Sequence, residues 1–339
     1  MRNEGQVMKS DRILLFGIVA FAQVPAFAQL TPDEDFAERC STAGVVSCFG
    51  FDNETTDVVR GVNLYADGLG TYRAGVDTTT KASGAGSLRF ELPPPPHAGA
   101  NIGGSWVPAG GWGQNFSENS TFYVQYQMRL SPYMVESGAF DGYTWKTTIF
   151  HSGSRTCGAI ELTTSNYYGS PMAQMNTSCG GRGMWTTLDG STYTATPPLL
   201  LQQSDDPMCE YGSNYATDCE NYVANEWMTL YYRVHIGTWN QPNSSIDAWL
   251  GRQGASTLRQ FVKVRNFPLD CNGSDCTIAP DRDDGYNNVT ITPYMTGLPG
   301  TVGPSTTAYM WFDEFIVSTQ PIPVPNVIRP REPGGFGTQ

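Results

Sequence analysis

Short runs of β-branched and aromatic residues, separated by clusters of Gly, Pro, Asn and Asp, follow one another along most of this chain. This pattern is typical of antiparallel strands, and helical periodicity is scarce. The 37 glycines and 23 prolines among 339 residues, with only 15% charged residues, also disfavour long helices. We expect strands over residues 87–92, 121–130, 144–151, 159–164, 172–176, 227–236, 245–250, 259–267, 288–295 and 308–318. The sequence therefore predicts an all-β fold, an antiparallel β-sandwich or barrel.

The first 28 residues have the layout of a secretory signal peptide. Lys9 and Arg12 precede an apolar run over residues 13–22, and a small-x-small cleavage site ends at Ala28. The run is too short to cross a bilayer, and no later run reaches about 20 apolar residues. We expect cleavage near Ala28, a secreted, extracellular or periplasmic location, and no membrane span.

The rest of the chain is expected to form one domain over residues 29–320, followed by a flexible Pro- and Gly-rich tail over residues 321–339. Over all 339 residues, 32 acidic residues outnumber 20 lysines and arginines, which gives a net charge of −12. A nucleic-acid binder needs a basic surface, so this class of partner is excluded.

All eight cysteines follow the expected cleavage site. An even count in an oxidising compartment predicts disulfides. A zinc site is disfavoured, because the sequence contains no Cys-x-x-Cys pair. Short loops suggest the pairs Cys40–Cys48, Cys157–Cys179, Cys209–Cys219 and Cys271–Cys276. The sequence leaves the connectivity open.

On several expected strands one face is apolar, and the other carries amide, guanidinium, imidazole, phenol or indole groups. The polar faces hold Tyr123, Gln125, Gln127, Arg129, Glu161, Thr163, Tyr231, Arg233, His235, Asp247 and Trp249. Planar rings stack on the C–H faces of sugars, and amides and guanidinium groups bind hydroxyls and carboxylates. The pattern favours a concave carbohydrate groove. The alternative is a solvated sheet face with chance aromatics.

Several short motifs follow a recognisable order along the chain. They are YVQYQMR at 123–129, WKTTIFH at 145–151, NEWMTL at 225–230, YMTG at 294–297 and MWFDEFIV at 310–317. In this order the chain resembles the concanavalin-A-like jelly-roll polysaccharide lyases, the group that contains alginate and glucuronan lyases. The resemblance spans roughly residues 45–318 and implies a jelly-roll β-sandwich. The implied activity is β-elimination on an acidic, uronate-containing polysaccharide.

In that family an Arg and an amide neutralise the uronate carboxylate, while a His and a Tyr transfer protons. The resemblance implies that Arg129, His151 and Tyr294 take these catalytic roles, and we expect them within reach of one monosaccharide. The residues expected to bind substrate are Gln125, Gln127, Lys146, Glu161, Tyr231, Arg233, His235 and Trp249. His235 is also a rival of His151 as the proton-transferring histidine. We expect a monomer that requires no cofactor.

Other functions stay open from the sequence. A non-catalytic carbohydrate-binding or adhesive protein of the same fold would explain the aromatic content and the disulfides equally well. A retaining glycoside hydrolase would need two carboxylates about 5 Å apart on one strand face. Asp313 and Glu314 are adjacent, so strict alternation would place them on opposite faces. The acidic run over residues 281–287 suggests a calcium site, but it lacks EF-hand spacing.

Overall fold

The computed structural model describes residues 30–53, 74–96, 104–135, 145–152, 161–167, 170–178, 183–187, 192–195, 200–201, 219–239, 241–253, 255, 257–269, 285–295 and 299–325. The strands are β1 (Val45–Phe49), β2 (Ala74–Asp77), β3 (Ser87–Leu92), β4 (Ser120–Leu130), β5 (Trp145–His151), β6 (Glu161–Tyr167), β7 (Ser170–Ser178), β8 (Gly183–Thr187), β9 (Thr192–Ala195), β10 (Leu200–Leu201), β11 (Met228–Ile236), β12 (Pro242–Gly251), β13 (Arg259–Pro268), β14 (Asn288–Met295) and β15 (Ala308–Ser318). The helices are α1 (Pro32–Cys40) and α2 (Pro132–Val135).

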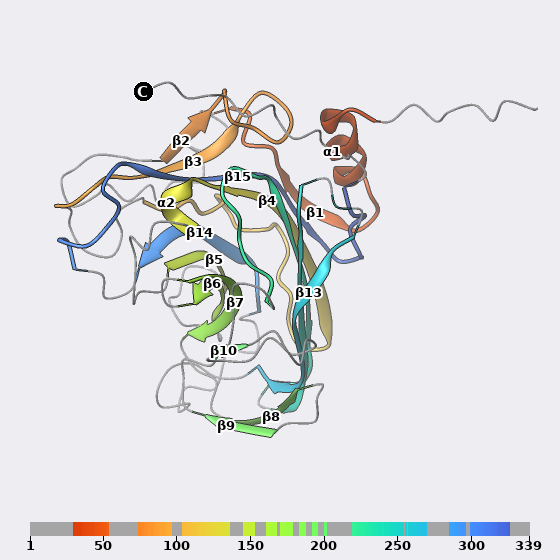
Figure 1. The fold of residues 1–339 in the computed structure, drawn as a ribbon. Coiled ribbons are helices and arrows are strands. Elements are labelled where there is room, and N and C mark those ends of the chain that lie inside the picture. Colours follow the sequence, from red (N-terminus) through yellow and green to blue (C-terminus); the bar gives the residue numbers. More distant parts are fainter. Residues whose placement is uncertain are drawn as a thin grey trace, which may run out of the picture.

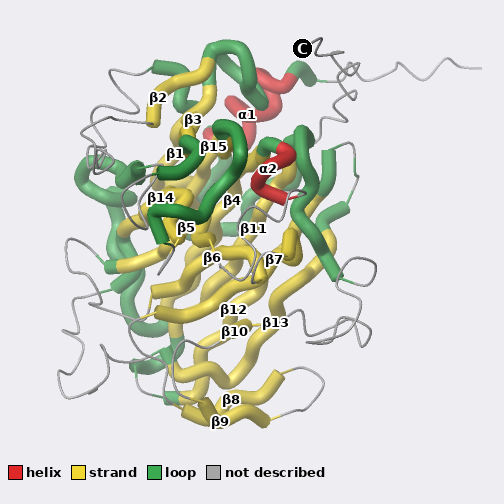
Figure 2. Tube along the Cα trace, turned by 60° about the vertical axis from the view of Figure 1, so that its left-hand side comes forward, coloured by secondary structure: helices red, strands yellow, loops and turns green. Residues whose placement is uncertain are grey.

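The described residues form two antiparallel sheets (Figure 1). The large sheet has the order β2-β3-β15-β4-β11-β12-β13-β8-β9, with β1 paired to β15, and the small sheet has the order β10-β7-β6-β5-β14. Figure 2 shows that strands dominate, with both helices near the end that holds β2 and β3, and β8 and β9 at the other end. The predicted all-β antiparallel sandwich is confirmed.

The alternation along β4 explains how this strand packs. Phe122, Val124, Tyr126, Met128 and Leu130 are completely buried and belong to one hydrophobic core. That core also contains the inward residues of the small sheet, so it fills the space between the two layers. The polar residues between them on β4 therefore lie on the outer face of the large sheet.

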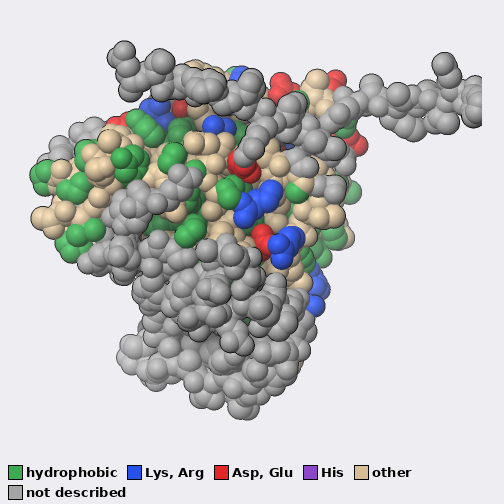
Figure 3. Space-filling view, in the orientation of Figure 1, with side chains coloured by type: hydrophobic (Ala, Val, Ile, Leu, Met, Phe, Trp, Pro, Cys, Tyr) green, Lys and Arg blue, Asp and Glu red, His purple; other side chains and the backbone are tan. Residues whose placement is uncertain are grey.

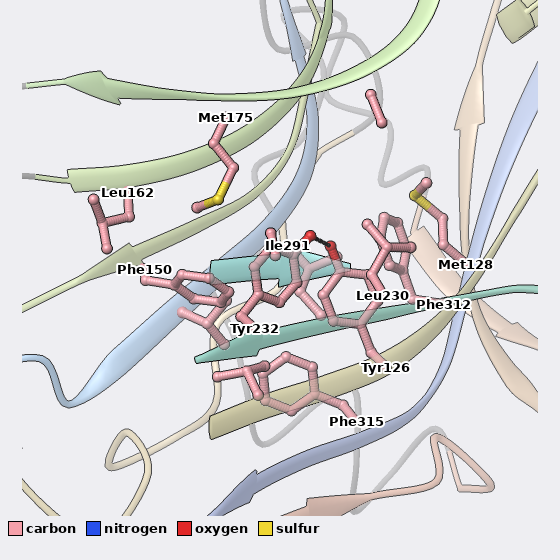
Figure 4. Close-up of a cluster of buried hydrophobic side chains, with 14 of the residues drawn as sticks. Tyr126, Met128, Phe150, Leu162, Met175, Leu230, Tyr232, Ile291, Phe312 and Phe315 are labelled. Carbon is pink, nitrogen blue, oxygen red and sulfur yellow. Dashed lines mark hydrogen bonds between the residues drawn. The ribbon is translucent and has the colours of Figure 1, made fainter. Parts of the chain in front are cut away.

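The core contains a hydrogen-bonded pair of tyrosines that connects the two sheets (Figure 4). The hydroxyl groups of Tyr126 and Tyr232 lie 3.0 Å apart. Tyr126 also meets the hydroxyl of Thr148 on β5 at 3.2 Å, and Thr164 on β6 donates to Tyr232 at 2.9 Å. Because buried hydroxyl groups need partners, this network fixes how the small sheet sits on the large one.

Helix α1 is anchored at both ends. Thr31 and Glu34 form a capping box at its start. The disulfide Cys40–Cys48 joins its last residue to β1, which confirms the first expected pair. Cys219 is also disulfide-bonded. The other cysteines, like the expected signal peptide, lie outside the described residues.

The beginning of the expected tail is packed against the large sheet. Ile322 is buried, and its backbone N–H donates to the hydroxyl of Tyr231 at 3.1 Å. Residues 321–325 therefore continue the folded domain past the boundary expected from sequence. Among the residues that the structure describes, no helix is long and apolar enough to cross a membrane.

Candidate functional site

The three expected catalytic residues lie on different sheets. Arg129 is on β4 of the large sheet, whereas His151 and Tyr294 are on β5 and β14 of the small sheet. Their neighbours Met128 and Phe150 are completely buried between the sheets, so Arg129 and His151 extend from opposite outer faces. The expectation that all three meet at one monosaccharide is therefore wrong. Strand alternation predicts the faces of a strand but not the sheet to which it belongs.

A polar row crosses four strands of the small sheet. Tyr294 is paired with Lys146, Lys146 with Ser165, and Ser165 with Gln174. The residue that follows Gln174 on β7, Met175, belongs to the hydrophobic core. The four side chains, called here the Lys146 row, therefore lie on the outer face of the small sheet.

Lys146 has an unusual electrostatic environment. Its side chain is half-buried, and this burial lowers the pKa of Lys146 from its ordinary value, although the negative charge of Glu161 opposes the shift. Its ammonium lies 5.3 Å from the centroid of the Tyr294 ring. A lysine with a lowered pKa has a larger neutral fraction near neutral pH, and the neutral amine can accept a proton.

Buried amide and hydroxyl groups continue the row beside Lys146. Gln174 Nε2 donates to the backbone oxygen of Asn166 at 2.6 Å and to Ser165 Oγ at 3.3 Å. Ser165 Oγ in turn donates to Asn176 Oδ1 at 3.0 Å. The Oε1 atom of Gln174 is buried and has no hydrogen-bond partner within the described part of the chain.

Sequence reasoning missed Ser165, Gln174 and Asn176. The signal was available on β7, because Gln174 and Asn176 alternate with the core residues Ala173 and Met175. The pairing of these strands with Lys146 is a matter of register, which the sequence does not reveal.

His151 occupies the same outer face, near one end of β5. Its Nδ1 lies 3.2 Å from the backbone oxygen of Ser152, and its Nε2 lies 2.9 Å from Thr290 Oγ1. A carbonyl only accepts, so Nδ1 carries a proton in this contact, and Nε2 is in contact with the threonine hydroxyl. To act as a base at Nε2, His151 would have to give up this second hydrogen bond.

The outer face of the large sheet is partly covered, which corrects the expectation of an open groove there. Arg39 of α1 donates to Gln125 Oε1 at 2.6 Å, and Gln125 Nε2 donates to the backbone oxygen of Pro323 at 3.0 Å. Tyr231 is held by Ile322, and burial raises its pKa to about 12. Gln125 and Tyr231 are therefore structural contacts for α1 and residues 321–325.

The other expected binding residues on the large sheet lie beside this covered strip. Gln127 lines a pocket together with Trp227, Thr229, Arg252, Leu258 and Val324. Arg233 forms an ion pair with Asp247, His235 Nδ1 lies 3.0 Å from Thr121 Oγ1, and the Trp249 ring lies 5.5 Å from that of Tyr231. None of them shares a face with Lys146.

Asp313 and Glu314 do not alternate as expected. A bulge in β15, where Glu314 has a φ of 52°, places both carboxylates on the outer side of the large sheet. Asp313 accepts backbone N–H bonds from Ala82 and Ser83, and Glu314 accepts from Arg39. Both side chains are completely buried, and burial raises the pKa of Asp313 well above its usual range. Their structural partners argue against a glycosidase site.

Within the described residues no group of three or more His, Cys, Asp or Glu side chains is arranged to hold a metal ion. Residues 281–284 of the suggested calcium site lie outside the described part of the chain.

No protein-family model and no curated protein matches this chain. Several solved structures are similar to this chain. The alginate lyase of the PL-14 type from Aplysia kurodai superposes with a TM-score of 0.52 at 12% identity, over 82% of this chain and 100% of that one. The endo-β-1,4-glucuronan lyase from the fungus Trichoderma reesei has a TM-score of 0.43 at 11% identity, over 73% of this chain and 87% of that one. The similarity to the Aplysia structure confirms the polysaccharide-lyase-like jelly-roll fold.

Proposed function

We propose that this protein is a secreted polysaccharide lyase that cleaves a uronate-containing polysaccharide on the outer face of the small sheet. The observation that carries the proposal is the Lys146 row, which sets a half-buried lysine of lowered pKa directly beside a tyrosine. A base and a phenol side by side are the groups that β-elimination requires. The fold, which is similar to that of an alginate lyase, supports the same reaction class by analogy.

In the proposed reaction the neutral amine of Lys146 takes the proton from C5 of the uronate. The electron pair of the broken C–H bond forms the C4=C5 double bond, and the bond from C4 to the glycosidic oxygen breaks. Tyr294 gives its phenolic proton to that oxygen, and the ammonium of Lys146 then returns a proton to the phenolate. Both residues are restored, and no oxidant, metal or other co-reactant is consumed.

The developing negative charge on the uronate carboxylate needs hydrogen-bond donors. Arg129 lies on the other face and cannot supply them. Asn176 is the proposed donor, because its Oδ1 accepts from Ser165, which leaves its Nδ2 hydrogens to donate. Glu161 and His151 are the proposed flanking residues, and the extracellular or periplasmic location follows from the expected signal peptide.

The test is to incubate the purified mature chain with alginate, glucuronan and polygalacturonate, and to follow the ultraviolet absorbance of the new double bond. We expect absorbance to rise with at least one polymer, and Lys146→Met to abolish it while the circular dichroism spectrum is retained. Lys81→Met is the matched control, because Lys81 is exposed and its Nζ donates to the nearby backbone oxygen of Gly84. Binding without absorbance would favour the non-catalytic carbohydrate-binding alternative. Full activity in Lys146→Met would overturn the proposed site.

A further inference from the structure

A buried carboxylate organises a cluster of cations on the outer face of the large sheet, beyond the strip that α1 and residues 321–325 cover. Arg265 Nη2 lies 2.7 Å from Asp247 Oδ1, and Arg233 Nη1 lies 3.3 Å from Asp247 Oδ2. Gln260 Nε2 donates to Asp247 Oδ1 at 2.9 Å. Lys263 is the partner of Asp247 in the β12–β13 register. We call Arg233, Lys263 and Arg265 the cationic surface.

The cationic surface has more positive charge than its internal carboxylate can neutralise. The side chain of Asp247 is 2% exposed, whereas those of Arg233 and Arg265 are 40% and 32% exposed. One acid thus holds two guanidinium groups by part of their donor sets. Arg265 Nη1 also donates to the backbone oxygen of Val264 at 2.9 Å, and both side chains stay partly exposed to solvent. An ordinary surface ion pair is balanced. Here the excess is positive, on a chain whose net charge is −12.

An aromatic ring borders the cationic surface. Trp249 lies two residues beyond Asp247 on β12, on the same face, and is half-buried. Its ring packs at 5.5 Å against that of Tyr231, which fixes its orientation, and its register partner is Gln260. Figure 3 shows basic side chains at the margin of the molecule where β13 lies in Figure 1.

We propose that the cationic surface and Trp249 form a second, non-catalytic binding surface for an acidic polysaccharide, on the opposite face of the sandwich from Lys146. A guanidinium group pairs with a carboxylate in a planar, directional way, and an indole ring accepts the C–H face of a sugar. The net negative charge of the protein disfavours nucleic acid, which needs many phosphate contacts. The polymer class rests on the proposed function, but the surface does not. A chain held at both faces would stay near the enzyme between cleavage events.

The test uses the full mature chain carrying Lys146→Met, so that binding is measured without turnover. Affinity electrophoresis in gels containing alginate, glucuronan or polygalacturonate compares this protein with a variant that also carries Arg233→Gln, Arg265→Gln and Asp247→Asn. The last change avoids leaving a buried unpaired carboxylate. Lys81→Gln is the control, because it alters the net charge by the same amount, −1. We expect about tenfold weaker binding in the triple variant and a change of less than about twofold in the control.

A second measurement separates this surface from the catalytic row. In the chain with an intact Lys146, we expect the triple variant to cleave uronate tetrasaccharides at the unaltered rate and long polymers with a raised KM. The surface would be overturned if the parent had no affinity for any polyuronate, or if the parent and the triple variant bound both polyuronates and a DNA duplex equally well. If the triple variant bound a DNA duplex more weakly than its parent but bound polyuronates equally well, the ligand of the surface would not be an acidic polysaccharide. If polyuronate binding were weaker in the triple variant but the chain with an intact Lys146 cleaved none of the polymers, the proposed lyase activity would be wrong and the binding surface would be supported.

Discussion

The ammonium of Lys146 lies over the ring of Tyr294, 5.3 Å from its centroid, and the two residues are direct register partners across β5 and β14. The ring attracts the charged form of the lysine, whereas burial favours the neutral form. Burial lowers the pKa of Lys146, and the negative charge of Glu161 opposes this shift. Burial therefore makes the neutral form of Lys146 more accessible than that of an exposed lysine.

Replacing Glu161 by Gln should shift the pH dependence of catalysis. The Glu161 carboxylate raises the pKa of Lys146 against the effect of burial, so its removal lowers that pKa further. The base works in its neutral form, so the rising limb of kcat/KM should move to lower pH. A pH profile on the preferred uronan measures this shift. Glu91→Gln, on the large sheet beside Arg89, should leave the limb in place. A limb that moved to higher pH would contradict the role of Lys146.

Tyr294→Phe should distinguish the role of the phenolic hydroxyl from that of the aromatic ring. The ring and its contact with Lys146 are retained, but the proton donor is lost, so kcat should fall by about a hundredfold with little change in KM. Tyr309→Phe, on β15 of the other sheet, is the matched control. Steady-state kinetics give both constants. A rise in KM with unchanged kcat would instead make Tyr294 a residue that only binds the sugar.

The sequence could predict the layers of this fold because each strand has its own hydrophobic pattern. The five buried apolar residues of β4 alternate as expected, and the short Cys40–Cys48 loop is closed as expected. Local signals of this kind are contained within one strand or one loop, so they can be seen without knowledge of the partners.

Long-range pairing explains what the sequence could not predict. The amide side chain of Gln125 could bind a sugar, and the sequence predicts this role. In the structure Gln125 is instead buried by contacts with Arg39 and Pro323, which are 86 and 198 residues away. Similarly, Lys146 acquires its neighbours only when β5 pairs with β6 and β14. Strand patterns do not contain the register, so the candidate site moved from Arg129 on one sheet to Lys146 on the other.

Arg39→Met should destabilise the domain without altering the chemistry at Lys146. The Arg39 guanidinium is 2% exposed and is shared by Asp35 at 2.9 Å, Gln125 at 2.6 Å and Glu314 at 2.5 Å. Its loss removes a buried positive charge from beside the Asp35 and Glu314 carboxylates, which costs about 3–5 kcal/mol in the free energy of unfolding. Urea denaturation measures this cost, and a second change, Glu314→Gln, should recover part of it. A loss below about 1 kcal/mol would show that the network is solvated.

Asp77 should make the stability of the domain sensitive to acid. Burial alone would raise its pKa, but hydrogen bonds from Thr79, Thr80 and the Trp311 indole lower it from 3.8 to about 2. A carboxyl whose pKa is lower in the folded state stabilises the fold above pH 3.8, and that contribution, about 2 kcal/mol, disappears as the pH falls towards 2. Asp77→Asn removes the charge at every pH. The difference in unfolding free energy between the wild type and this variant should therefore shrink by about 2 kcal/mol from about pH 6 to about pH 2. Urea titrations at several pH values measure this difference, with Asp33→Asn on the first turn of α1 as the control. A difference that does not depend on pH would mean that the Asp77 carboxylate contributes no charge-dependent stability.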